Sequence, residues 1–247
     1  MEFPAGTFRP DTGRAPTVSM VLAQARIESM LFLRHGEQQL LSLVIPMTML
    51  VALSLLPLIA DPLPKVFPLT LAISAMSSGF TGQAIGVAFD RRYGALKRVG
   101  ASGVPAWTII SGKIVAVLAV VTLQTLLLTT TALLLGWSAP VTSIPAVVIT
   151  LAFGVAAFAS LGLLVGGTLG SELVLALANL LWFILLGTAS YVMLRGGGGF
   201  EWVPSVALAQ GLAHALEGHI PTLEIGMLAC WFVAGGLGAS RFFRFTA

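Results

Sequence analysis

Residues 114–171 read IVAVLAVVTLQTLLLTTTALLLGWSAPVTSIPAVVITLAFGVAAFASLGLLVGGTLGS and contain no Asp, Glu, Lys or Arg. A helix that crosses the hydrocarbon core of a bilayer needs about 20 apolar residues, so this run is too long for one crossing. Gly136-Trp-Ser-Ala-Pro140 lies within it and carries the residue types at which a helix breaks. The run therefore predicts two membrane-spanning helices, over about 107–135 and 141–168, joined by a short turn.

The rest of the chain repeats this pattern. Further charge-poor windows predict spans at about 39–60, 66–89, 173–194 and 221–240. The chain is 57% hydrophobic and 9% charged, with a mean hydropathy of +0.96, whereas about a quarter of the residues in a soluble domain are charged. We therefore expect an all-α polytopic membrane protein, in which residues 1–247 form a single domain with six transmembrane helices.

Basic residues are distributed unevenly between the predicted loops. Of the 13 Lys and Arg residues, all but Lys65 and Arg195 fall on one side of the predicted spans. The positive-inside rule then predicts a multi-pass protein of the cell membrane with both termini in the cytoplasm. The net charge of +3 follows from this topology and from contact with anionic lipid headgroups, and it does not indicate nucleic-acid binding.

Three segments outside the spans have their own character. Residues 1–16 contain several Pro and Gly residues but no apolar core, which predicts a flexible cytoplasmic tail rather than a signal peptide. Residues 17–37 alternate apolar and charged side chains as an amphipathic helix at the cytoplasmic interface does, although a simple membrane anchor is the alternative. Residues 195–220 form the longest predicted external segment.

The most charged predicted loop covers residues 90–104. Its first part, Asp90-Arg-Arg-Tyr-Gly-Ala-Leu-Lys-Arg-Val-Gly100, carries five charges in eleven residues. If this part is helical, one face carries Tyr93, Leu96, Val99 and Gly100, and such a face can dock on another protein. The alternative is that the positive charges only fix the topology. Glu172, in a predicted tight cytoplasmic turn, either pairs with a basic residue of this region or remains solvated.

This loop and its surroundings resemble the type-2 ATP-binding-cassette (ABC) exporter permeases. Asp90-Arg-Arg-Tyr-Gly94-Ala-Leu96-Lys-Arg-Val99, followed by Ala101-Ser102 and Gly112-Lys113, is similar to the acidic-Arg…Gly…Leu…Leu…Thr-Pro…Gly-Lys signature of that family. Ser102-Gly103 stands where the family usually has Thr-Pro. The segment from Arg26 to Pro46 is similar to the family's connecting helix and first span, and residues 195–216 resemble its proline-led re-entrant hairpin.

The resemblance implies a mechanism and a set of partners. The chain contains no Gly-x-x-x-x-Gly-Lys-Ser/Thr phosphate loop, so we do not expect it to hydrolyse ATP. The family implies that separate cytoplasmic ABC ATPase subunits bind ATP and Mg²⁺ and drive export by alternating access. Family permeases work with twelve spans, which implies a second copy or a sister permease. The implied ATPase-coupling residues are Asp90, Arg91, Arg92, Tyr93, Gly94, Leu96, Lys97, Arg98 and Val99.

Uncharged polar and aromatic residues at membrane depth are candidates for a substrate path. The resemblance implies that the second and fifth spans line the central cavity, where the candidates are Ser77, Ser78, Thr81, Asn179 and Phe183. Each of them can instead satisfy a backbone carbonyl or a neighbouring helix. The expected substrate is a small drug-like or lipid-like amphiphile, with a glycan or glycolipid as the alternative.

A third function comes from another class. His214 and His219 could be metal or haem ligands of a non-transporting scaffold or cofactor-binding subunit, but helical metal pairs prefer a spacing of four. We therefore expect no catalytic residue, metal site or cofactor in this chain. Small residues spaced by four predict close helix packing within the chain or at a dimer seam. They are Gly82, Gly86, Gly162, Gly166 and Gly170.

Overall fold

A computed structural model describes residues 15–56, 60–95, 106–138 and 140–243 of the chain. Within these ranges every regular element is a helix. Four helical segments are long and apolar enough to cross a membrane, which supports a membrane-embedded, multi-pass protein. They are Ser111–Leu134 within α7 (Ala106–Leu134), Val141–Thr168 comprising η3 (Val141–Ser143) and α8 (Ile144–Thr168), α9 (Ser171–Arg195), and α11 (Thr222–Phe242).

Two further helical runs contain a π-helical turn. The first joins α2 (Gly36–Gln39), η1 (Leu40–Val44) and α3 (Ile45–Leu55). The second joins α4 (Leu63–Met76), η2 (Ser77–Thr81) and α5 (Gly82–Arg92). We call them the first and second runs. Four of the six predicted spans thus correspond to the long apolar helices, whereas the spans predicted at 39–60 and 66–89 fall on these two runs and remain predictions.

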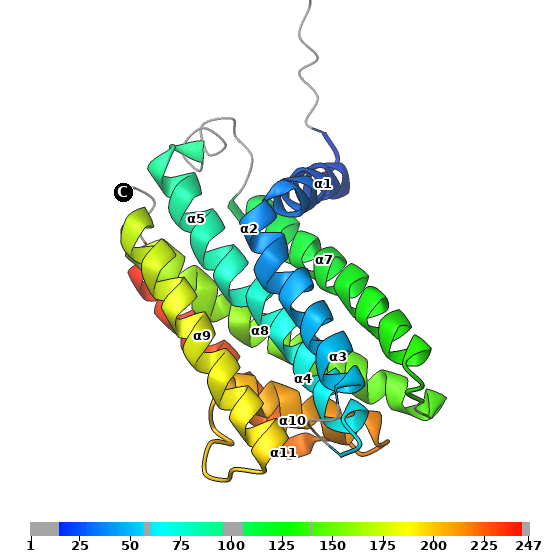
Figure 1. Ribbon diagram of the computed structural model, residues 1–247. Coiled ribbons are helices and arrows are strands. Elements are labelled where there is room, and N and C mark those ends of the chain that lie inside the picture. The colour runs from blue at the N-terminus through cyan, green and yellow to red at the C-terminus, as the bar shows by residue number, and fades with distance from the viewer. Residues whose placement is uncertain (1–14, 57–59, 96–105, 139, 244–247) are drawn as a thin grey trace, which may run out of the picture.

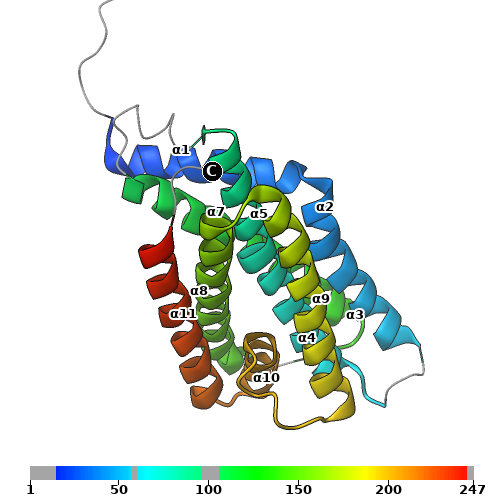
Figure 2. The same cartoon turned by 90° about the vertical axis from the view of Figure 1, so that its left-hand side faces the viewer.

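Successive long helices run in opposite directions, and two shorter helices lie across the ends (Figures 1 and 2). α1 (Thr17–Arg34) packs on α7 and crosses the end of the bundle where α5 and α8 finish and α9 begins. α10 (Pro204–Leu216) lies at the opposite end, between α9 and α11. The segment expected to be external therefore contains one proline-led helix rather than a helical hairpin.

The second run forms the centre of the bundle. Its residues from Val66 to Thr81 are all buried, because α3, α7, α8, α9 and α10 surround it. A helix that is covered on every side needs no polar face, which explains why this stretch shows no amphipathic pattern. α10 closes the bundle against it, and Val206, Leu208 and Leu212 of α10 have no exposed surface.

Glycines allow α8 to approach the second run closely. A Cβ on Gly162 would lie 2.7 Å from a backbone carbonyl oxygen of η2, and a Cβ on Gly166 would overlap a carbonyl oxygen of α5. Gly82 is similarly covered by side chains of α1 and α2. The prediction of packing within the chain is confirmed at these three positions. Gly86 and Gly170 face open space within the described structure, so for these two positions the dimer-seam alternative remains a prediction.

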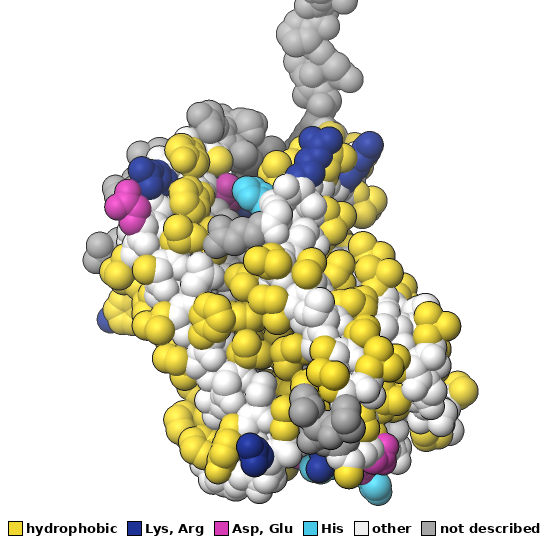
Figure 3. All heavy atoms as spheres, viewed as in Figure 1, with side chains coloured by type: hydrophobic (Ala, Val, Ile, Leu, Met, Phe, Trp, Pro, Cys, Tyr) yellow, Lys and Arg dark blue, Asp and Glu magenta, His cyan; other side chains and the backbone are white. Residues whose placement is uncertain are grey.

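Charged side chains gather toward the two ends of the bundle, and a broad hydrophobic surface lies between them (Figure 3). Lys65 and Arg195 belong to elements that meet at the α10 end. The other described basic residues belong to α1 itself or to the parts of α5, α7 and α11 near the α1 end: Arg26, Arg34, Arg91, Arg92, Lys113 and Arg241. The unequal distribution seen in the sequence thus separates the two ends of the molecule. That the α1 end faces the cytoplasm remains a prediction.

Candidate functional site

The candidate site is a group of charged residues around the last turn of α5, which we call the α5 charge cluster. It sits at the α1 end of the bundle, directly before the 96–105 segment. Its members come from four helices, so the end of α5 is connected to most of the bundle. The cluster consists of Glu28 of α1, Asp90, Arg91 and Arg92 of α5, Lys113 of α7, and Glu172 of α9.

Lys113 joins three helices. Its Nζ donates hydrogen bonds to Glu28 Oε1 at 2.7 Å and to Asp90 Oδ2 at 2.8 Å. Gln24 Nε2 donates to the same oxygen of Glu28 at 2.8 Å. The lysine side chain is only 10% exposed, so the two carboxylates replace the water that its ammonium group loses on burial. α1 and α5 are therefore both bound to the start of α7 by one cation.

The residue before this lysine explains how α1 comes so close. A Cβ on Gly112 would lie 2.5 Å from the Cγ atom of Gln24, so any larger residue would push α1 away from α7. With glycine at this position, α1 crosses α7 one turn before Glu28. The Gly112-Lys113 pair thus combines close approach with an ionic contact at the same crossing.

Arg91 and Arg92 connect α5 to the turn between α8 and α9. Arg91 Nη1 donates to the carbonyl oxygens of Gly166 at 2.8 Å and Leu169 at 2.9 Å, at the end of α8, where carbonyls lack helical partners. Arg91 is buried. Arg92 Nη1 lies 3.3 Å from Glu172 Oε1, so of the two alternatives for this carboxylate the pairing is present, although the Glu172 side chain is 86% exposed. Both partners of that second pair are exposed, so it contributes little stability.

The predicted coupling residues divide into a described and an undescribed group. Asp90, Arg91 and Arg92 belong to the last turn of α5, and the chain turns at Tyr93 and Gly94. Leu96, Lys97, Arg98 and Val99 lie outside the described residues. Tyr93 is 64% exposed and its ring stacks on Phe89, with the centroids 6.0 Å apart.

One part of the coupling prediction is wrong. Gly94 has a φ of +68°, the left-handed conformation with which helices commonly end. A single helix over 90–101 would need a right-handed helical conformation at this position. A continuous helix over 90–101 is therefore interrupted at Gly94, and Leu96 and Val99 lie outside the described residues.

A second group of polar residues lies inside the bundle, and we call it the inner hydrogen-bond network. Gln124 of α7 lies at its centre. Its Oε1 atom accepts from Ser78 at 2.8 Å and lies 3.0 Å from Ser74 Oγ, while its Nε2 donates to Ser42 Oγ at 3.0 Å. All four residues are buried. The network therefore joins both runs to α7 in a region where water cannot satisfy these groups.

The two π-helical turns take part in this network. A π-helical turn shifts the backbone hydrogen-bond ladder, and side chains here bind the carbonyl oxygens within it. Ser77 Oγ lies 3.0 Å from the Leu41 carbonyl oxygen of η1, and Gln38 Nε2 donates to the Ser77 carbonyl oxygen of η2 at 2.9 Å. Trp182 of α9 donates to Ser77 Oγ at 2.6 Å. The first run, the second run and α9 are thus joined at one level.

The predicted substrate-path residues occupy different environments. Ser77, Ser78 and Thr81 have no exposed surface, and the first two belong to the inner hydrogen-bond network. Asn179 is half-buried on α9. Phe183 is 60% exposed and contacts Trp182 edge-on, with the ring centroids 5.0 Å apart. The five residues thus range from fully buried to exposed, and their role in substrate transport remains a prediction.

The histidines of the α10 end are bound to separate carboxylates. His214 Nδ1 lies 2.9 Å from Glu224 Oε1, and His219 Nδ1 lies 3.8 Å from Glu217 Oε2. Within the described ranges no group of three or more His, Cys, Asp and Glu residues is arranged to hold a metal ion. Glu201 is another charged residue near this end. The backbone amides of Glu201 itself and of Gly199 donate hydrogen bonds to its exposed carboxyl group, and these bonds lower the pKa of that group.

Sequence reasoning missed the partners of Lys113 and the whole role of Gln124. A lysine at the head of an apolar helix and a lone amide within the charge-free run were the available signals, since polar groups at membrane depth need partners.

No protein-family model, curated protein or solved structure matches the chain. The geometry of the α5 charge cluster therefore provides the main basis for a functional interpretation.

Proposed function

We propose that this chain is the membrane-spanning subunit of an ATP-driven ABC exporter, energised by a separate ATPase subunit. It moves a drug-like or lipid-like amphiphile by alternating access, and it assembles with a second copy of itself or with a sister permease. The observation that carries this proposal is the α5 charge cluster. The turn of α5 that leads into the proposed coupling loop is bound to α7, α8 and α9 and, through Lys113 of α7, to α1.

In this proposal, ATP-driven closure of the ATPase pushes on the 90–104 loop and displaces the end of α5. Arg91 transmits that displacement to α8, because its guanidinium group is buried and bound to the last α8 carbonyls. Lys113 transmits it to α1 and α7 through two short ion pairs. The surface pair of Arg92 and Glu172 is weaker and follows the motion.

The inner hydrogen-bond network provides the second step. It connects the second run to the first run, to α7 and to α9, so a displacement of α5 reaches helices on both sides of the bundle. Phe183, exposed on α9 next to the buried Trp182, is where we propose that the amphiphile contacts the chain. The second permease covers this side of α9 and completes the path.

The test is purification of the tagged chain from native membranes in mild detergent, followed by mass spectrometry and an ATPase assay. We expect a stoichiometric ABC ATPase in the wild-type preparation. Leu96→Asp, in the proposed coupling loop, is expected to remove it. Ile220→Asp is the matched control, because it makes the same kind of change at an apolar residue that is 75% exposed between α10 and α11, at the opposite end.

Two results would contradict the proposal. A clean wild-type preparation without any ATPase shows that the chain is not part of such a transporter. An ATPase that remains bound to the Leu96→Asp variant shows that the 90–104 loop is not the docking element. Loss of the ATPase from the Leu96→Asp variant alone supports both the partner and the loop.

A further inference from the structure

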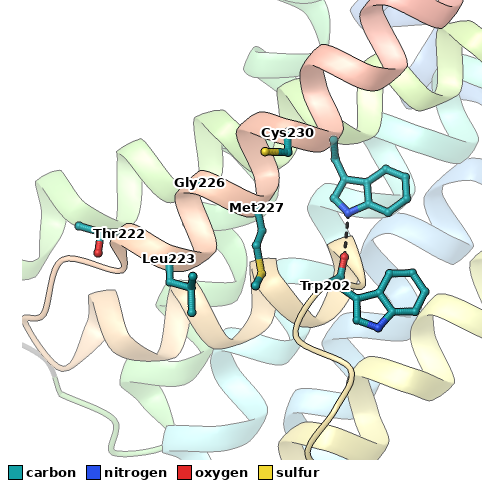
Figure 4. Close-up of a pocket in the computed structure, with 7 residues that line it drawn as sticks. Trp202, Thr222, Leu223, Gly226, Met227 and Cys230 are labelled. Carbon is teal, nitrogen blue, oxygen red and sulfur yellow. Dashed lines mark hydrogen bonds between the residues drawn. The ribbon is translucent and has the colours of Figure 1, made fainter.

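A groove with a volume of about 420 Å³ lies on α11, toward the α10 end of the bundle (Figure 4). It is lined by Trp202, from the segment before α10, and by six residues of α11 between Thr222 and Trp231. This volume falls within the range of about 300–1,000 Å³ that is typical of ligand pockets. Neither the α5 charge cluster nor the inner hydrogen-bond network contributes to it.

The lining of the groove is apolar. Trp231 Nε1 donates a hydrogen bond to the Trp202 carbonyl oxygen at 2.8 Å, so the polar group of this indole is satisfied and its ring is available for apolar contact. The other lining side chains carry no charge, and the Thr222 hydroxyl lies at one end of the groove, where α11 begins. The groove therefore has the chemistry of a site for a hydrocarbon chain.

The groove also runs parallel to the axis of α11, as an acyl chain beside a spanning helix would. Thr222, Gly226 and Cys230 follow one another at intervals of four, so they form a row of small residues along the helix. At 1.5 Å per residue this row extends for about 12 Å parallel to the α11 axis. Trp202 lies beside Trp231, about halfway along the candidate span, and with 61% of its surface exposed it closes the end of the groove opposite Thr222.

We propose that this groove binds one acyl chain of a bilayer phospholipid and holds it longer than the general lipid shell does. α11 is a candidate membrane span, and only 11% of its most apolar 18-residue stretch is buried inside the protein, so the surrounding bilayer is what covers this face. An acyl chain is uncharged and lies roughly along a spanning helix, which matches the lining and the direction of the groove. This inference does not depend on the proposed transport function.

The test uses the full chain in phosphatidylcholine vesicles that contain a small fraction of phosphatidylcholine with a photoactivatable diazirine on one acyl chain. After illumination, mass spectrometry locates the labelled residues. We expect labelling to be concentrated between residues 222 and 231, and to be at least about fivefold above that of the exposed residues Val233 and Leu237 on the same helix. Labelling of the groove is also expected to saturate at a low fraction of the probe.

Two glycines of α11 give a matched pair of variants. A side chain added at Gly226 meets no atom within 4 Å, so Gly226→Leu fills the groove without displacing the backbone. Gly236 also faces open space but does not line the groove, so Gly236→Leu is the control. We expect Gly226→Leu to abolish the concentrated labelling and Gly236→Leu to preserve it, with the melting temperatures of both variants close to that of the wild type.

Two results would overturn the proposal. Even labelling of every exposed face of α11 shows that only the general lipid shell is present. A cross-link between the Cys230 residues of two chains, without lipid label in the groove, shows that a protein surface covers this face. Because Cys230 is the only cysteine in the sequence, the position of such a cross-link is unambiguous.

Discussion

Replacement of Lys113 by methionine tests whether its ion pairs hold the α1 end of the bundle together. Methionine retains most of the aliphatic volume, so the main loss is the charge that neutralises Glu28 and Asp90. Breaking a fully buried ion pair on one side costs about 3–5 kcal/mol, whereas an exposed pair contributes about 0–1 kcal/mol. The two carboxylate side chains are 21% and 32% exposed, so water replaces part of the lost interaction.

We therefore expect Lys113→Met to reduce the free energy of unfolding by about 2–3 kcal/mol. For a chain of this size that corresponds to a melting temperature about 4–12 °C lower. The assay is thermal unfolding in detergent followed by tryptophan fluorescence. Lys65→Met is the control, because Lys65 is exposed at the opposite end and makes no ion pair within the described structure.

A double substitution separates the charge effect from a packing effect. In Lys113→Met alone, two neighbouring carboxylates remain without a cation. Adding Asp90→Asn removes their mutual repulsion, so the double variant is expected to be more stable than Lys113→Met. The reasoning is refuted if Lys113→Met lowers the melting temperature no more than Lys65→Met does, or if Asp90→Asn lowers it further.

Three further substitutions test the other contacts by the same measurement. Gly166→Ala places a Cβ against the Ala84 carbonyl oxygen and is expected to cost about 1–3 kcal/mol, whereas Gly170→Ala, in open space, is expected to have little effect. Gln124→Leu removes the shared hydrogen-bond partner of Ser42, Ser74 and Ser78. At about 0.6 kcal/mol for each hydrogen bond in a membrane, this substitution is expected to cost about 2 kcal/mol. The control is Thr122→Val, because Thr122 is exposed and its hydroxyl group bonds only a carbonyl oxygen of its own helix. Arg91→Ala leaves the last α8 carbonyls without a donor and is expected to be several-fold more destabilising than Arg92→Ala, and equal effects would contradict the role assigned to Arg91.

The elements predicted well are those that depend on composition over a long window. The charge-free run from 114 to 171 and its break near Gly136 correspond to α7, η3 and α8, because bilayer thickness sets both the length and the apolarity of such helices. The helix predicted from residue 17 is present and ends at Arg34, three residues before its predicted end. Its position at the membrane interface is still a prediction.

The α10 helix was harder to predict. Its 13 residues are too few to cross a bilayer, so composition predicts only an external segment at 195–220, and the resemblance to ABC exporter permeases implies a proline-led re-entrant hairpin there. Apolar stretches of this length are more often buried, and here Ala207, Leu208 and Leu212 fill the end of the bundle against the second run. The sequence contains the apolar residues but not the space that they occupy.

Contacts between distant residues were the least predictable. Glu28, Asp90 and Lys113 are separated by 62 and 23 positions, and they meet only because Gly112 lets α1 cross α7 at that point. The Arg92 and Glu172 pair is one of the two alternatives that the sequence leaves open for this carboxylate, since both residues are predicted in loops on the same side of the membrane. The α5 charge cluster therefore combines one contact that follows from topology with others that depend on helix packing.

The π-helical turn at Ser77–Thr81 has a consequence for how the second run should be compared with other sequences. A π turn accommodates about one more residue than an α turn, and one residue corresponds to about 100° of rotation around a helix. A helical wheel drawn straight through residues 63–92 therefore assigns the α5 residues to the wrong side by about that angle. An alignment with a relative that lacks this turn needs a one-residue gap here, and without it Asp90 and Arg91 are matched to positions on a different face of the helix.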